Sequence, residues 1–167
     1  MPDAAGPPRL LDSTDLQLLR LLQEDGRTSN VDLARAVSLS PAPCLRRVQR
    51  LEEEGIIRRY VALVDAGALG HAMNVFISVR LERQTKEVVD RFEHEIQRLP
   101  EVLECYWMAG ENDYLLRVST ADLLAYERLL MNHLTRIDGV ANIQSSITMR
   151  QVKYSTALPV DTIGVDR

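Results

Sequence analysis

Arginine side chains are concentrated in one short part of this chain. Residues 27–60 hold seven arginines against four carboxylates, a local charge of +3, whereas the whole chain carries −4. Guanidinium groups grip phosphates and read base edges through paired hydrogen bonds. Because the local field at a contact matters more than the total charge, this segment favours a polyanion-binding surface. The chemistry to expect here is contact with nucleic acid.

A second cluster has the chemistry to bind a zwitterion. In the stretch "WMAGENDYLL", Gly110 would let a ligand approach the backbone, exposed amides would receive a carboxylate, and Asp113 would hold an ammonium group. The same residues suit a hairpin turn, in which Gly110 and Asn112 adopt unusual backbone angles and Asp113 caps the turn. From the residues alone, both interpretations stay open.

Patterns of catalysis and metal binding are missing from the sequence. There is no GxSxG, no HExxH, no phosphate-cradling glycine loop and no paired Cys–His zinc spacing. His71, His94 and His133 fall on three different predicted elements, and Cys44 and Cys105 are predicted to be small core residues of a reducing compartment. Neither a secretory leader nor an apolar run of about 18 residues occurs. We expect a cytoplasmic protein that is not an enzyme, holds no metal or cofactor and has no membrane partner.

The N-terminal third is predicted to form three short helices. "DSTDLQLLRLLQEDG" begins with Asp12 or Ser13 as a cap and stops at Gly26, and "RTSNVDLARAV" follows. The third helix begins at "SPAPCLRR", with Ser40 as its cap. Its two prolines lie in the first turn, where the amides have no carbonyl partner inside the helix, so they mark a start and not a break.

The third helix is predicted to have one buried and one basic face. At about 100° per residue, Cys44, Val48 and Leu51 share one side. A solvated charged face is the alternative interpretation, but the basic stretch "GIIRRYVALV" that follows reads as a strand, and the whole arrangement is typical of a winged helix-turn-helix. The predicted DNA-binding residues are Arg27, Ser29, Ser40, Ala42, Pro43, Arg46, Arg47, Gln49, Arg50 and Arg58.

The remaining two thirds alternate between strand and helix patterns. Strands are expected at 71–81, 101–109, 114–120 and 140–154, with helices at 85–100 and 121–137 capped by Thr85 and Thr120. The order βαββαβ is that of a ferredoxin-like unit with an antiparallel sheet and both helices on one face. The chain is thus expected to be an α+β protein.

The other face of the predicted sheet has no helix to cover it. Phe76, Tyr106 and Met108 make this face partly apolar. Because large apolar patches on a soluble protein mark interaction sites, we expect this face to meet another copy of the chain.

These motifs together resemble the Lrp/AsnC family, the leucine-responsive or feast/famine transcription regulators. The resemblance runs from about Leu11 to Leu158 and is carried by "LDSTDLQLLRLLQEDGR", "LSPAPCLRRVQRLEEEGIIRRY" and "MAGENDYLLRV". It implies a winged helix-turn-helix over 11–60, a hinge over 61–71, and an effector-sensing domain over 72–154. The run "HLTRIDGVANIQSSITMRQVKYSTALPV" is similar to members that control branched-chain keto acid or proline breakdown.

The resemblance also implies partners and a second site. Such proteins dimerise by their sheets and assemble further into tetramers or octamers on double-stranded DNA, with a small amino acid bound between dimers. The effector residues expected on this basis are Met108, Ala109, Gly110, Glu111, Asn112, Asp113, Tyr114, Ser146 and Thr148. The alternatives are a stand-alone amino-acid-sensing or assembly module, which would have no use for the basic segment, and an architectural DNA-binding protein without effector.

Overall fold

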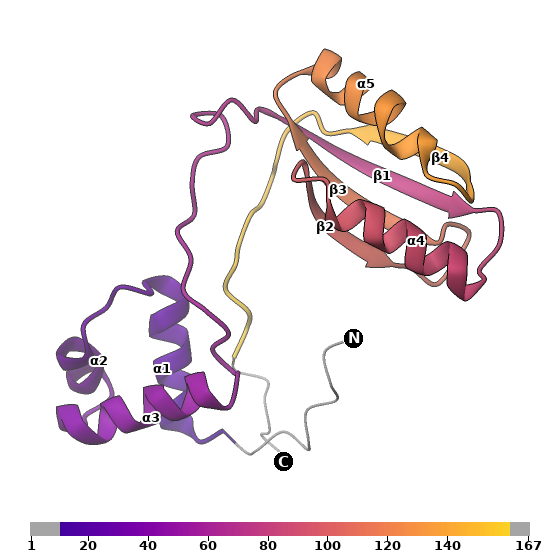
Figure 1. The fold of residues 1–167 in the computed structure, drawn as a ribbon. Coiled ribbons are helices and arrows are strands. Elements are labelled where there is room, and N and C mark those ends of the chain that lie inside the picture. Colours follow the sequence, from indigo (N-terminus) through magenta and orange to yellow (C-terminus); the bar gives the residue numbers. More distant parts are fainter. Residues whose placement is uncertain (1–10, 161–167) are drawn as a thin grey trace. The chain divides into compact units, whose positions relative to one another are not determined.

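The computed structural model describes residues 11–160, which form two units (Figure 1). One unit contains the chain up to Leu63 together with a C-terminal segment that begins at Lys153, and the other spans Val64–Val152. The predicted DNA-binding region, 11–60, therefore gains a segment from the far end of the sequence. Within the described residues, no helix is long and apolar enough to cross a membrane.

The first unit contains α1 (Ser13–Glu24), α2 (Asn30–Ala36) and α3 (Pro41–Glu53), as the sequence predicts. Asp12 caps α1 through a capping box, because its side chain accepts from the amide of Asp15 while the Asp15 carboxylate accepts from the amide of Asp12. Ser40 is the N-cap of α3 by its extended backbone, although its hydroxyl makes no capping bond.

The three helices bury the predicted apolar faces. Cys44 and Val48 of α3 pack with Leu18 of α1 in one cluster, and Leu51 packs with Leu19 in a second. This packing leaves the far side of α3 facing solvent.

The predicted strand at 55–64 is wrong. Between α3 and β1 the described chain contains turns and extended backbone but no strand. A strand must pair its amides and carbonyls with a neighbour, and residues 11–160 offer no neighbouring strand here. Tyr60 instead packs its ring beside Gly26 and donates its hydroxyl to Glu52 at 2.8 Å, and burial together with this carboxylate raises the pKa of Tyr60 to about 12.

The second unit has the predicted order βαββαβ. It contains β1 (Met73–Leu81), α4 (Lys86–Gln97), β2 (Val102–Trp107), β3 (Tyr114–Thr120), α5 (Leu123–Asn132), a short 3₁₀ helix η1 (Leu134–Arg136) and β4 (Val140–Ile147). The antiparallel sheet has the order β2-β3-β1-β4, and both helices cover one face (Figure 1). The α+β prediction is confirmed.

Three local predictions in this unit are wrong. Asp122, not Thr120, caps α5, since its side chain accepts from the amide of Ala125 at 2.7 Å while Thr120 ends β3. The last helix and strand stop at Asn132 and Ile147, shorter than predicted. Cys105 is exposed on β2, which is an edge strand of the sheet, and is not a core residue.

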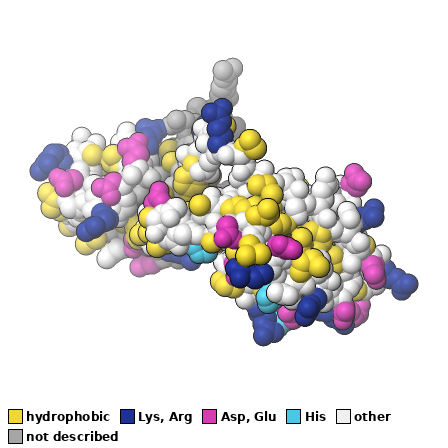
Figure 2. Space-filling model, turned by 90° about the horizontal axis from the view of Figure 1, so that it is seen from above, with side chains coloured by type: hydrophobic (Ala, Val, Ile, Leu, Met, Phe, Trp, Pro, Cys, Tyr) yellow, Lys and Arg dark blue, Asp and Glu magenta, His cyan; other side chains and the backbone are white. Residues whose placement is uncertain are grey.

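The two faces of the sheet differ as expected. Val75, Ile77 and Val79 point into the core beneath α4 and α5. On the other face, Phe76 and Tyr106 are 37% and 51% exposed. Figure 2 shows hydrophobic side chains among charged ones on one side of the molecular surface.

Candidate functional sites

The outer face of α3 presents a short polar stripe. Ala42, Arg46 and Gln49 are exposed and recur at helical spacing, opposite the buried Cys44 and Val48. Among residues 11–160, Arg46 has no ion pair or side-chain hydrogen bond, so its guanidinium group is available to a ligand.

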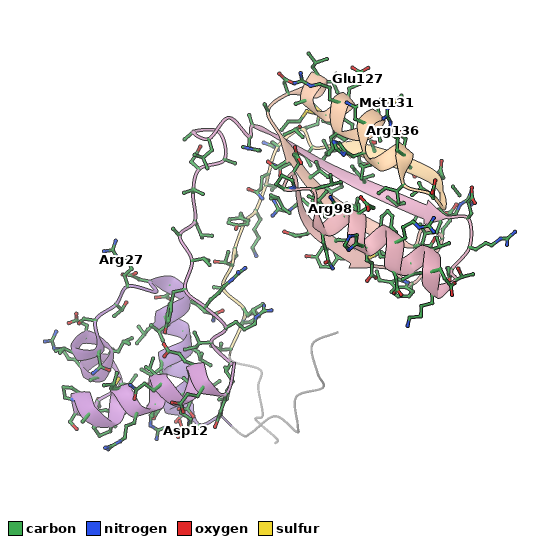
Figure 3. All side chains as sticks on the ribbon, viewed as in Figure 1. Asp12, Arg27, Arg98, Glu127, Met131 and Arg136 are labelled. Atoms are coloured by element: carbon green, nitrogen blue, oxygen red, sulfur yellow. The ribbon has the colours of Figure 1, made fainter. Side chains whose placement is uncertain are left out.

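Arg47 and Arg50, in contrast, turn toward the start of α1. Arg47 Nη1 lies 2.6 Å from Asp12 Oδ2 and 2.9 Å from Asp15 Oδ1. Arg50 Nη2 lies 2.6 Å from Asp15 Oδ2. Asp12 appears beside α3 in Figure 3. The sequence placed both arginines with the DNA-facing residues, but the structure pairs both with carboxylates of α1.

The contact between Asp12 and Arg47 shifts the pKa of both groups. The amide of Asp15 holds the pKa of Asp12 below its usual value, and Arg47 acts in the same direction against the effect of burial. The two carboxylates raise the pKa of Arg47. Asp12 and Arg47 therefore stay ionised at neutral pH.

The other predicted DNA-binding residues lie outside the hydrophobic core of the first unit. Ser29 is the N-cap of α2 and its hydroxyl accepts from a first-turn amide. Arg27 follows α1 at the opposite end from Asp12 (Figure 3), and both Arg27 and Arg58 are exposed. Ser40 is exposed at the start of α3, and Pro43 in its first turn is half-buried. None of them belongs to the hydrophobic core, so all remain open to a DNA contact.

The predicted effector loop forms the turn of the β2–β3 hairpin. Gly110 has φ of +153°, a conformation that favours glycine, and the space where a Cβ would lie is open. The amide of Met108 donates to the Asp113 carbonyl at 2.8 Å and closes the turn. Ala109 and Glu111 are exposed, so the backbone at this turn is accessible.

Asp113 does not have the surroundings expected of an ammonium-binding group. It is 5% exposed, its Oδ2 accepts from the amide of Leu81 at 2.6 Å, and its Oδ1 accepts from Gln84 Nε2 at 2.5 Å. Its carboxylate joins the loop to the end of β1, a contact that the sequence did not predict. The loop's remaining exposed carboxylate is Glu111.

Tyr114 is also part of the fold. It is 1% exposed, its ring centroid lies 4.5 Å from that of Phe92, and its hydroxyl donates to Glu93 at 2.9 Å. Burial and this carboxylate raise the pKa of Tyr114. Tyr114 therefore joins the end of the loop to the hydrophobic core of the second unit.

The two halves of the predicted effector site lie apart within one chain. Ser146 is opposite Phe76, and Thr148 bonds the carbonyl of Asn74 through its amide and hydroxyl. Asp113, in contrast, bonds the other end of β1 at Leu81. At about 3.4 Å per residue, Leu81 lies ~17 Å from Phe76 and ~24 Å from Asn74 along β1. One ligand cannot touch both in the same chain.

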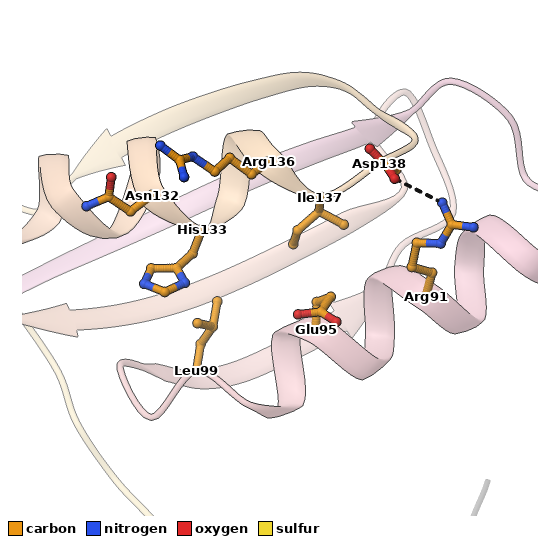
Figure 4. A pocket seen from close by; sticks show the side chains of 8 residues that line it. All are labelled: Arg91, Glu95, Leu99, Asn132, His133, Arg136, Ile137 and Asp138. Atoms are coloured by element: carbon orange, nitrogen blue, oxygen red, sulfur yellow. Dashed lines mark hydrogen bonds and ion pairs between the residues drawn. The ribbon is translucent and has the colours of Figure 1, made fainter.

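A separate pocket opens between α4 and the end of α5 (Figure 4). It is lined by Arg91, Glu95, Leu99, Asn132, His133, Arg136, Ile137 and Asp138. An ion pair of 3.3 Å joins Arg91 to Asp138 at one end. None of the predicted effector residues lines this pocket, and no group of three or more potential metal ligands occurs within residues 11–160.

Comparison with known protein families accounts for both units. The model of the winged helix-turn-helix DNA-binding domain matches residues 11–58, and that of the Lrp/AsnC ligand binding domain matches residues 74–158. The chain belongs to the Lrp/AsnC family. It is therefore a DNA-binding transcriptional regulator with an amino-acid ligand-binding domain, and the prediction that it is not an enzyme is confirmed by the family.

Individual Lrp/AsnC proteins resemble it over nearly their whole length. The Bkd operon transcriptional regulator of Pseudomonas aeruginosa is 49% identical over 150 residues, which cover 90% of this chain and 98% of that one. The leucine-responsive regulatory protein of Escherichia coli is 40% identical over 156 residues, 93% and 95% of the two chains. The first relative agrees with the predicted branched-chain keto acid branch.

Solved structures share the fold. A transcriptional regulator from Neisseria meningitidis, crystallised with L-Met, has a TM-score of 0.87 at 39% identity, covering 90% of this chain and 97% of the other. An AsnC family regulator from Agrobacterium tumefaciens has a TM-score of 0.86 at 41% identity, covering 90% and 98%.

Sequence reasoning missed two residues that shape the sites. Asp15 and Gln84 were not singled out, yet they engage Arg50 and Asp113. The spacing of Asp12 and Asp15 signals a capping box at a helix start, so the sequence carried a sign of the local role of Asp15. Nothing local identifies its second role, because Arg50 lies 35 residues further along the chain.

Proposed function

We propose that this regulator reads double-stranded DNA with α3, using Arg46 and Gln49 as its principal base-contacting side chains. The observation that carries the proposal is the exposed Arg46, without a partner in the described chain, on the face opposite the buried Cys44 and Val48. An arginine bonds guanine and a glutamine bonds adenine in the major groove, and the small Ala42 permits close approach. Its relatives are bacterial transcription regulators, so we place its action in the cytoplasm, where bacterial DNA lies.

The DNA contact is tested by replacing Arg46 with alanine. Binding to a duplex selected from random DNA by the wild-type protein should weaken by about 1–3 kcal/mol, and discrimination at one base pair should be lost. Wild-type affinity should also fall steeply with salt, since phosphate contacts release counterions. Unchanged affinity of Arg46→Ala would show that α3 is not the recognition helix.

The effector we propose is a small aliphatic amino acid bound between two copies of the chain. The loop 108–114 of one copy would meet Ser146 and Thr148 of another, because these segments lie ~17 to ~24 Å apart along β1 within one chain. Backbone amides beside Gly110 would receive the ligand carboxylate, and the exposed Glu111, instead of Asp113, would accept its ammonium group. The names of the relatives, leucine-responsive and Bkd operon regulators, support this ligand class.

Calorimetry with leucine, isoleucine, valine and methionine tests the site. Glu111→Gln removes the charge from an exposed side chain and should weaken binding without lowering the melting temperature. Glu127→Gln, an exposed change on α5, is the matched control. If both variants bind like the wild type, Glu111 is not the ammonium partner.

We also propose that the chain forms a homodimer through the open face of the sheet, and that dimers assemble further into tetramers or octamers. Phe76 and Tyr106 on that face are partly exposed, and Arg117, tied to Glu104 at 2.7 Å, lies between them. Light scattering at micromolar concentration should give a multiple of 18.9 kDa. A monomer would contradict both the interface and the shared effector site.

A further inference from the structure

We infer that Asp15 is a positioning residue for the recognition helix: it withdraws Arg47 and Arg50 from the DNA and leaves Arg46 and Gln49 to read the bases. This inference rests on the proposed role of α3. Position on the helix does not separate the arginines, because Arg50 is one turn beyond Arg46 and rotated from it by only about 40°. The arginines differ in their ion pairs: Arg47 and Arg50 are bound to Asp15, whereas Arg46 is not.

The Asp15 carboxylate is the centre of this arrangement. It is 1% exposed and each of its oxygens has a guanidinium partner, Arg47 at 2.9 Å and Arg50 at 2.6 Å. It also lies in the first turn of α1, where the helix dipole favours a negative charge. A buried carboxylate with these partners is costly to leave unpaired, so the two arginines are held in place.

Two contacts fix α3 along its length. Asp15 and Asp12 hold its middle through Arg47 and Arg50, and Asn30 of α2 donates its side-chain amide to the carbonyl of Pro41 at the first turn, at 2.8 Å. A helix fixed at both places presents its exposed stripe at one angle. Pre-organisation of this kind favours one DNA register over others.

The inference separates two kinds of effect on DNA binding. Loss of a base-reading side chain relaxes specificity at one base pair, whereas loss of Arg50, which in this scheme only fixes the helix, weakens binding to all sequences alike. A guanidinium group released from Asp15 can reach a phosphate of the DNA. Each new phosphate contact makes the slope of log affinity against log salt concentration steeper by about 0.9.

The experiment compares four full-length variants on a selected operator, on single-base variants of it and on random duplex. Arg46→Ala should lose about 5- to 150-fold in operator affinity and flatten discrimination at one base pair. Arg50→Ala should weaken binding by one factor across the whole panel and keep the discrimination profile. Asp15→Asn should steepen the salt dependence and bind random duplex more tightly. Glu24→Gln, which makes the same charge change at the exposed end of α1, should behave as the wild type.

The outcomes separate a failure of the proposed role of α3 from a failure of the inference about Asp15. If Arg46→Ala leaves the profile intact, α3 is not the recognition helix and the proposed function fails. If Arg46→Ala flattens the profile and Arg50→Ala also flattens it at a base pair, Arg50 reads DNA and the inference about Asp15 is overturned. If Asp15→Asn does not fold, the discrimination profile of Arg50→Ala still tests whether Arg50 reads DNA.

Discussion

Each candidate site is organised around one buried carboxylate, Asp15 in the first unit and Asp113 in the second. Asp15 and Asp113 are almost completely buried; Asp15 accepts three hydrogen bonds and Asp113 accepts two, from side chains and backbone amides. Because a buried charge is tolerated only when it is paired, such groups serve the fold first. The groups left for ligands are the exposed ones beside them, Arg46 and Glu111.

Asp113→Ala should destabilise the C-terminal unit. The change leaves the amide of Leu81 and the side chain of Gln84 without their acceptor, and an unsatisfied buried donor costs about 1–3 kcal/mol. Thermal unfolding should show the loss, and Glu111→Ala in the same loop is the control. A melting temperature equal to that of the wild type would return Asp113 to the role of ligand contact.

Replacing Asp12 with asparagine isolates its charge, because asparagine also caps helices well. The pKa of Asp12 is lowered in the fold, so its ionised form adds stability above its unfolded value of about 3.9, and this stability disappears as pH falls through the lower folded value. Asp12→Asn should therefore be less stable than the wild type at pH 7, and the two should converge below about pH 4. Urea midpoints measured across this range check the convergence, and a constant difference would contradict it.

At the scale of elements, the sequence predicted those features that depend on neighbours in the chain. The starts of α1 and α3 follow from Asp12, Ser40 and Pro41, and the strands of the second unit follow from alternation. The strand at 55–64 failed because pairing needs a second strand, which no local pattern supplies. Asp15 was not singled out, and the partners of Asp113 were not predicted, for a similar reason, since their partners are distant in sequence.

Asp122→Ala tests the corrected start of α5. The side chain of Asp122 accepts from the amide of Ala125, and loss of such a cap costs about 0.5–2 kcal/mol. Glu127→Ala, which removes an exposed carboxylate from the middle of the same helix (Figure 3), should change stability little. Denaturant unfolding compares the two, and an equal effect of both changes would show that Asp122 acts only through its charge.

At the scale of the whole chain, the first unit is completed by residues far from it in sequence. Gln23 donates to the carbonyl of Leu158 at 3.1 Å and accepts from its amide at 2.7 Å. Val160 is 7% exposed and packs with Leu19 and Leu51. Sequence patterns gave no sign of this contact, because 135 residues separate Gln23 from Leu158. The DNA-binding unit thus incorporates the chain that leaves the ligand-binding domain.

Because the C-terminal segment packs on the first unit, Val160→Ala should destabilise the DNA-binding unit, although Val160 lies outside its three helices. Removing two buried methyl groups from the contact with Leu19 and Leu51 should cost about 1–2 kcal/mol. Leu158→Ala is the matched control, because its side chain is 74% exposed while its backbone keeps both bonds to Gln23. Hydrogen exchange of the α1 amides reports the stability of this unit alone, and it should speed up in Val160→Ala but not in Leu158→Ala. Equal exchange in both variants would mean that the C-terminal segment lies on the unit without supporting it.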